Sequence, residues 1–255
     1  MERRILIAVC VLALSGCASY TTPGGPVSMA GIDDATIEEA YLRQPASGFP
    51  ANIAMIRIQD AGYSTRTAFG HRVGAWSVVT TRDIESEDAI ERIASLPLID
   101  GVAPVGRLLL PQDARGMKDL RRSAAQLRAD MLLVYSVDTQ YTVEGQTFGP
   151  FTAISLGMLP NRKAHVTSTV SGLLIDVRTG FIYGSSESTA TEQQRSGAWT
   201  TAAAADEARI RSEAQAFEDF VDEFATLWSG VAANHASRPA MVPSARDGWH
   251  YDQRD

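Results

Sequence analysis

Apolar and polar positions along the chain change their spacing from block to block, and each block predicts a strand or a helix. Residues 52–58 carry apolar side chains at every second position, which is typical of a strand. Residues 77–81 form either a short strand or a lead-in to the next element. Residues 82–96 repeat apolar side chains at three- and four-residue spacing, which predicts a helix with one buried face. A further strand is predicted over 101–111, whose prolines favour a sheet edge or irregular ends.

The middle of the chain predicts a second helix that leads directly into a buried strand. Helical spacing covers residues 116–129, and a strand follows over 130–139. Its first part, Met131 to Val134, is apolar on both faces, as in a central strand covered on both sides. A longer strand is predicted over 163–177, with an apolar face and a face of hydroxyl and histidine side chains.

Two further elements complete the predicted domain. Residues 176–184 predict a β-hairpin in which Gly180 takes the left-handed backbone conformation. Residues 202–229 predict a long C-terminal helix, because aliphatic and aromatic residues recur in steps of four and three. The element order is β-α-β-α-β, then a β-hairpin, then the long helix. This order predicts a single α/β domain with a mixed β-sheet.

The first residues of the chain have the pattern of an export signal. Arg3 and Arg4 precede a short uncharged apolar run, and small residues Ser15 and Gly16 lead to Cys17. The apolar run is too short for a permanent membrane span, which needs about 20 residues.

The end of this signal, Leu14-Ser15-Gly16-Cys17, resembles the lipobox of bacterial lipoproteins. The resemblance implies cleavage between Gly16 and Cys17, diacylglycerol on the thiol of Cys17 and acylation of the new amine. Ala18 follows the cysteine, which by analogy with the sorting rule of that family implies the outer membrane, at its periplasmic face. The alternatives are an ordinary secretory signal cut near Ala13, or a cysteine buried in a short helix.

Cysteine usage and charge narrow the possible partners. Of the two cysteines, Cys10 would leave with the signal, so the mature chain could form no disulfide. The chain carries a formal net charge of −7, and loss of the basic signal makes it more negative. An acidic balance argues against nucleic acid and against electrostatic docking on anionic lipid. We therefore expect membrane attachment through acyl chains, whose methylenes each add about 0.8 kcal/mol of affinity.

These boundaries divide the chain into four expected segments. They are a signal peptide over 1–16, a lipidated tether with a short helix over 17–50, the α/β domain over 51–230 and a flexible tail over 231–255. The short helix is expected near 33–42, and Pro45 and Pro50 would stop it.

The search for chemistry finds no motif for a nucleotide, a catalytic metal or a nucleophile elbow, and no cofactor is expected. Asp138 and Asp176 end adjacent predicted strands and could form an acid/base pair, with His71 as a third member. Aspartates at strand ends are also common as turn and cap residues. A solvated loop histidine is the plainer interpretation of His71.

The segment between the two central strands is unusually apolar. Residues 148–159 contain few polar side chains but are too few for a membrane span. They could form a buried connection over the sheet, or a loop that touches a membrane or forms oligomers. The candidate interaction residues of this segment are Phe148, Phe151, Leu156, Met158, Leu159, Arg162 and Lys163.

Two longer runs, AAQLRADMLLVYSVDTQY and GMLPNRKAHVTSTVSGLLIDVRTGFIYG, resemble the rhombotarget-type bacterial lipoproteins. The residues that carry the resemblance are Asp130, Pro160, Asn161, Asp176 and Thr179. It implies a small α/β lipoprotein from bacteria with a dedicated protein-sorting system. The element order is also similar to that of curli-channel and penicillin-binding-protein-activator lipoproteins, which bind other proteins.

Together these patterns predict a lipid-anchored periplasmic binding or accessory protein for envelope assembly or surface-protein sorting, without catalysis. Its expected partners are the membrane and other envelope proteins. An envelope hydrolase built on the strand-end aspartates and an oligomeric outer-membrane channel component remain as alternatives. The sequence leaves the oligomeric state open.

Overall fold

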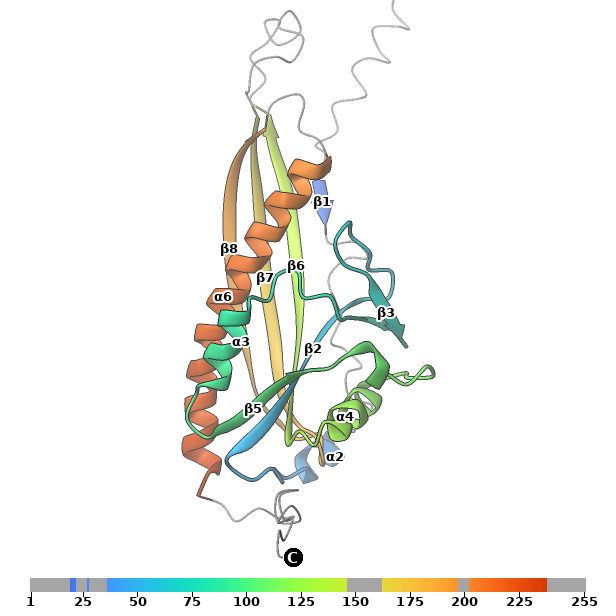
Figure 1. Ribbon diagram of the computed structural model, residues 1–255, viewed down its shortest axis with the longest axis vertical. Coiled ribbons are helices and arrows are strands. Elements are labelled where there is room, and N and C mark those ends of the chain that lie inside the picture. Colours follow the sequence, from blue (N-terminus) through green and yellow to red (C-terminus); the bar gives the residue numbers. More distant parts are fainter. Residues whose placement is uncertain (1–18, 22–26, 28–35, 146–161, 197–201, 238–255) are drawn as a thin grey trace, which may run out of the picture.

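The computed structural model describes residues 19–21, 27, 36–145, 162–196 and 202–237. Within them, eight strands form one mixed sheet, and helices pack on both of its faces (Figure 1). This confirms the predicted single α/β fold with a long C-terminal helix. The strands are β1 (Ser19–Thr21), β2 (Ala51–Asp60), β3 (Gly70–Val73), β4 (Trp76–Val79), β5 (Ile99–Pro104), β6 (Met131–Gly145), β7 (Arg162–Asp176) and β8 (Ile182–Ser196). The helices are α2 (Ile37–Leu42), α3 (Glu87–Ala94), the 3-10 turn η1 (Arg107–Leu109), α4 (Met117–Gln126) and α6 (Ala202–His235).

The sheet follows the order β3-β4-β2-β6-β7-β8. Strands β6, β7 and β8 form a long antiparallel meander, while β2 lies parallel to β6. The other edge of β2 is shared by two strands. It pairs in parallel with β5 along Ala51–Met55 and antiparallel with β4 along Arg57–Asp60. The sheet therefore splits at Ile56.

Alternate residues of the central strands supply two separate cores, one on each face of the sheet. Met131 and Leu133 face α3 and α6, whereas Leu132 and Val134 face α4. All four side chains have 0% exposure, which confirms the predicted central strand covered on both sides.

Helix α6 covers one face of the meander, and α4 packs on the opposite face of the sheet. The 34 residues of α6 correspond to a length of about 51 Å, close to that of the 15-residue strands beneath it. Phe217, Phe220, Phe224 and Trp228 form a continuous series of ring contacts, with centroids 6.1 to 6.5 Å apart, against the sheet. The aromatic stripe is therefore core. The helix ends at His235 rather than Ser229, because Val231 continues the buried stripe.

The sheet differs from the sequence prediction at several places. The strand predicted over 101–111 ends at Pro104, and Arg107–Leu109 form the turn η1 instead. Residues Ser19–Thr21, expected to be part of a free tether, pair with Gln140–Thr142 of β6. The stretch 60–75, expected to be a polar loop, contains β3 with His71. Strand β8 continues to Ser196, well beyond the predicted hairpin. These strands contain few apolar residues in alternation, so the sequence pattern did not predict them. In the structure they are recognised by their backbone pairing.

Candidate functional site

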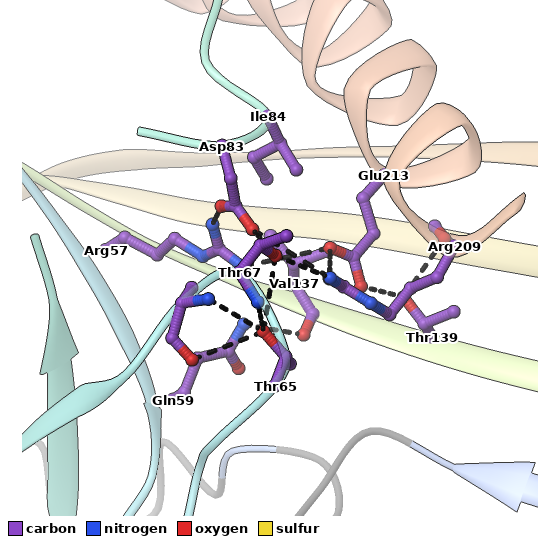
Figure 2. A network of polar contacts seen from close by, with 12 residues as sticks. Arg57, Gln59, Thr65, Thr67, Asp83, Ile84, Val137, Thr139, Arg209 and Glu213 are labelled. Carbon is purple, nitrogen blue, oxygen red and sulfur yellow. Dashed lines mark hydrogen bonds and ion pairs between the residues drawn. The ribbon is translucent and has the colours of Figure 1, made fainter. Parts of the chain in front are cut away.

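The most concentrated polar chemistry in the described chain surrounds Arg57 of β2. Its guanidinium Nη1 lies 2.8 Å from Asp83 Oδ1, and Nη2 lies 3.8 Å from Glu213 Oε2 (Figure 2). Nη1 also lies 3.6 Å from Glu85 Oε1. Arg57 has 2% exposure. Together with Arg209, these residues are called the Arg57 cluster below.

Strand alternation places Arg57 on the face that would otherwise continue the apolar core. Ile53 and Met55 occupy the same face of β2 and pack in the core beneath α6. Two residues further on, Arg57 meets the first turns of α6 instead of its aromatic part. A buried guanidinium requires carboxylate partners, and the 83–85 segment and α6 supply them from opposite sides.

The second arginine of the cluster binds along α6. Arg209 Nη1 donates to Glu213 Oε2 at 2.6 Å, and Arg209 Nε donates to Asp206 Oδ1 at 3.0 Å. Thr139 of β6 donates its hydroxyl to Glu213 Oε1 at 2.8 Å. The cluster thus joins β2, β6, the segment before α3 and the start of α6 through side chains alone.

Two tyrosine hydroxyls form hydrogen bonds with residues of the cluster. Arg57 Nη2 donates to the hydroxyl of Tyr63 at 2.9 Å, and Tyr135 donates its hydroxyl to Glu85 Oε1 at 2.8 Å. Burial, followed by the charge of Glu85, raises the pKa of Tyr135 well above its ordinary value. Tyr135 therefore stays a neutral donor to Glu85.

The charges of the cluster act on one another strongly. Burial by itself would lower the pKa of Arg57, but the carboxylates, led by Glu85, raise it above its ordinary value. Burial raises the pKa of Glu213 against the opposing effect of Arg209 and Arg57. Arg57 and Arg209 together contact four carboxylates, Asp206 included, and the pKa of Glu213 among them is raised.

A small pocket opens beside the cluster where β4 and β5 part from β2. It has a volume of about 20 Å³, and Arg57, Glu85 and Tyr135 are among its lining residues. This volume admits about one water molecule. Two buried atoms near this region, Arg57 Nε and Gln59 Oε1, make no hydrogen bond within the described part of the protein. The Arg57 cluster therefore has room for a bridging water but not for an organic substrate.

The structure does not bring the predicted acid/base residues together. Asp138 pairs with Thr169 and Asp176 pairs with Met131, so seven strand positions, about 23 Å, separate the two aspartates. His71 lies on β3, at the far edge of the sheet, opposite Val78. The alternative of a converging acid/base pair does not hold for Asp138 and Asp176, because the two residues lie at different positions along the same antiparallel ladder.

Asp176 instead organises the base of the sheet. Its Oδ2 accepts hydrogen bonds from the amides of Ala46 and Ser47, at 2.8 and 2.9 Å, and from the hydroxyl of Tyr183 at 2.9 Å. Its Oδ1 accepts from the amides of Arg178 and Thr179, both at 2.9 Å. Burial opposes ionisation, but these donors lower the pKa of Asp176 below its ordinary value. The alternative interpretation of Asp176 as a turn residue is confirmed.

Asp130 lies close to Asp176, and the acid/base hypothesis did not include it. It accepts from the amide of Asn52 at 3.0 Å and pairs with Arg178 at 3.1 Å. The hydroxyl of Ser47 lies 2.9 Å from the backbone carbonyl of Asp130 and 2.8 Å from Asp176 Oδ2, and its single proton can be donated to either oxygen. The two aspartates flank a shared hydroxyl, and their positions just before β6 and at the end of β7 were the available sequence signal.

The remaining candidate residues mostly lie outside the described residues. Gly16, Cys17 and the apolar run from Phe148 to Leu159 belong to this group. Arg162 and Lys163 begin β7, opposite Ser196 and Arg195 of β8. Over the described ranges, no helix is long and apolar enough to cross a membrane, and no three His, Cys, Asp or Glu side chains gather as metal ligands.

Comparisons with known proteins give matches among solved structures only. No family model and no curated protein matches the chain. A Xanthomonas campestris protein of family DUF330 is 12% identical, with TM-score 0.35, over 74% of this chain and 93% of its own. A predicted lipoprotein from Caulobacter crescentus is 16% identical, with TM-score 0.27, over 47% and 86%. A PelC dodecamer from Paraburkholderia phytofirmans is 14% identical, with TM-score 0.30, over 80% and 98%.

Proposed function

We propose that this chain is a bacterial envelope lipoprotein, anchored through Cys17 at the periplasmic face of the outer membrane, that works by binding other envelope proteins. The observation that carries the proposal is the Leu14-Ser15-Gly16-Cys17 sequence behind a basic, apolar start. Acyl chains would confine the domain to a surface and so raise its effective concentration toward other proteins held there.

The start of the fold supports an anchor close to the domain. Strand β1 begins at Ser19 and pairs with Gln140–Thr142 of β6. Cys17 lies only two residues before this strand, and two residues of extended chain span at most about 7 Å. An anchor at Cys17 would therefore hold the sheet near the bilayer, without a long linker between them.

Binding, rather than catalysis, fits the polar chemistry that the described residues contain. The carboxylates of the Arg57 cluster are engaged by arginines and hydroxyls, and its pocket admits about one water. Asp176 already accepts hydrogen bonds on both oxygens, and these donors lower its pKa, which makes it a weak base. A binding protein would use the outer surfaces of the sheet and helices.

Metabolic labelling with an alkyne fatty acid tests the anchor. The full-length protein and a Cys10→Ala variant should both carry the label and sediment with outer membranes. A Cys17→Ala variant should carry no label and should lose membrane retention. Label that survives Cys17→Ala, or a free thiol at a mature N-terminus beginning with Cys17, would refute the anchor. Crosslinking in intact cells with the labelled protein then tests for envelope partners.

A further inference from the structure

Among the residues that the structure describes, strand β8 ends the sheet and has no neighbouring strand on its outer edge. Among the described residues β8 pairs with β7 alone, over its whole length from Ile182 to Ser196. The other two long strands are flanked differently. β7 lies between β6 and β8, and the second edge of β6 is shared by β2 and β1. In Figure 1, β8 runs along the left margin of the meander.

This edge lacks several features by which proteins usually prevent further pairing. Residues 182–196 contain no proline and no lysine. The register with β7 is continuous from Gly184 to Ser196, because the one irregularity lies at Leu174/Ile175. Ser185, Thr189 and Thr191 are small and exposed on one face, and Ser186, Ser188 and Ala190 are small and buried on the other. None of these side chains is bulky enough to shield the backbone of β8 from a second strand.

We infer that the edge of β8 pairs with β8 of a second copy of this chain, antiparallel and centred on Thr191. The charges on the strand select this partner and this register. The charged residues between 182 and 196 are Glu187, Glu192 and Arg195. Glu187 and Arg195 are eight positions apart and share one face by strand alternation, whereas Glu192 belongs to the other face. With Thr191 opposite its own copy, Glu187 of each chain stands directly opposite Arg195 of the other.

The intrachain neighbours of these two residues explain what the second copy would add. In the backbone register of the sheet, Arg195 stands opposite Lys163 of β7. Glu187 is exposed, and Ser171 of β7 donates to it at 2.7 Å without neutralising its charge. In the pairing centred on Thr191, the register places Glu187 of each chain opposite Arg195 of the other, and symmetry makes this pair twice.

The symmetry also suits two copies held by one bilayer. Antiparallel edge pairing has a two-fold axis perpendicular to the sheet. Through the ladder, Ser19 of β1 is level with Thr142, His165 and Gln193. Gln193 stands opposite Thr189 in the dimer, so the two β1 strands lie about four positions, about 13 Å, apart along the strand axis. Both chains would then reach one membrane with the sheet lying along it. The pairing itself does not require lipidation.

Cysteine substitution at two matched threonines tests the pairing directly. Thr191 and Thr167 lie opposite each other on β8 and β7, and their hydroxyls share a 3.2 Å hydrogen bond, so either substitution removes the same contact. Thr191→Cys residues of two copies would stand within disulfide reach. Two Thr167→Cys residues would be three strand spacings, about 14 Å, apart, and a disulfide cannot bridge that distance.

Under mild oxidation of membranes containing the full-length protein, Thr191→Cys should give a disulfide-linked dimer, whereas Thr167→Cys and the unsubstituted protein should not. Equal yields of disulfide-linked dimer from the two variants would overturn the inference, because they would arise from random encounters and not from a defined strand register. A Thr191→Cys adduct with a different protein, without self-dimer, would overturn it in favour of a heterologous strand.

Charge reversal provides a second test that does not depend on thiols. In detergent extracts, Glu187→Arg or Arg195→Glu alone should reduce the dimer association constant by about ten-fold or more, because two attractive pairs become repulsive. The double reversal should restore most of it. Far-ultraviolet circular dichroism melting shows whether each variant is folded. A wild-type protein that sediments as a monomer at micromolar concentration, or a double reversal no better than the single ones, would overturn the proposed pairing.

Discussion

Ser47 and Asp176 are 129 residues apart in the sequence and meet at the base of the sheet. Ser47 donates its amide and its hydroxyl to the same oxygen, Asp176 Oδ2, at 2.9 and 2.8 Å. The other oxygen, Asp176 Oδ1, accepts hydrogen bonds from the amides of the turn that follows β7. One carboxylate therefore holds the segment before β2 against the hairpin between β7 and β8.

Substitution of Asp176 by Asn should strongly destabilise the protein. The amide NH₂ would face donors that now point at an oxygen, and the charge that strengthens these bonds would be lost. We expect the free energy of unfolding to fall by about 2–4 kcal/mol in urea titrations. Asp113→Asn is a suitable control because Asp113 is exposed, and its effect should stay within about 0.5 kcal/mol. Equal stabilities of the two variants would contradict the assigned role of Asp176.

The contribution of Asp176 should also depend on pH in a defined direction. Its pKa is lowered in the folded protein, while the unfolded chain has the ordinary value of about 3.9. The stability it supplies is therefore present above about pH 4 and is lost as the pH falls through the folded pKa. The difference in unfolding free energy between wild type and Asp176→Asn should shrink between pH 5 and pH 2. A difference that stays constant over this range would show that ionisation of Asp176 does not matter.

The sequence predicted those parts of the fold in which apolar spacing reports burial. Met131 to Val134 and the stripe from Phe217 to Trp228 are examples, because each position is apolar where the core requires it. Strand β1 escaped prediction because its backbone pairs with β6 while its residues Ser19, Tyr20 and Thr21 carry no periodic signal.

The buried polar groups were harder to predict, for a physical reason. Arg57 follows the apolar positions of β2 and would by itself be assigned to a surface face. It is buried because Glu85 and Glu213, 28 and 156 residues later, converge on it, and no local pattern encodes that convergence. Asp176 had a usable signal, the turn that follows it, whereas its contact with Ser47 depends on the complete fold.

Arg57 and Arg92 provide a matched comparison of buried and exposed ion pairs. Arg57 meets Asp83, Glu85 and Glu213 with 1% side-chain exposure, while Arg92 joins Glu218 and Asp222 of α6 with 43% exposure. Arg57→Ala leaves buried carboxylates without their cation and should lower the unfolding free energy by about 3–5 kcal/mol. Arg92→Ala should cost about 0–1 kcal/mol, because water screens its partners.

Guanidinium chloride would mask these charges, so urea titrations at low salt are the appropriate measurement. Addition of 0.5 M NaCl should reduce the small effect of Arg92→Ala further and leave that of Arg57→Ala nearly unchanged. Comparable losses for the two variants would show that the Arg57 cluster is hydrated in solution.

Gly172 of β7 and Gly230 of α6 should respond to alanine in opposite directions. A Cβ at Gly172 would lie 2.5 Å from Cζ of Phe220 and 3.4 Å from Cβ of Tyr135, inside a core with no room to relax. Gly172→Ala should therefore lower the unfolding free energy by about 1–3 kcal/mol. A Cβ at Gly230 meets no atom within 4 Å, so Gly230→Ala should raise it by about 0.5–1 kcal/mol through helix propensity.

A double variant separates this packing conflict from any intrinsic strand preference of alanine. Phe220→Leu removes the ring atoms that the new methyl would strike, at the cost of a partly filled site. If Phe220 is the obstacle, the combined effect of Gly172→Ala and Phe220→Leu on unfolding free energy should be clearly smaller than the sum of the two single effects, since contacting residues are not additive. Additive losses would mean that the cost at Gly172 arises in the backbone, and that α6 packs more loosely over β7 than the 2.5 Å approach implies.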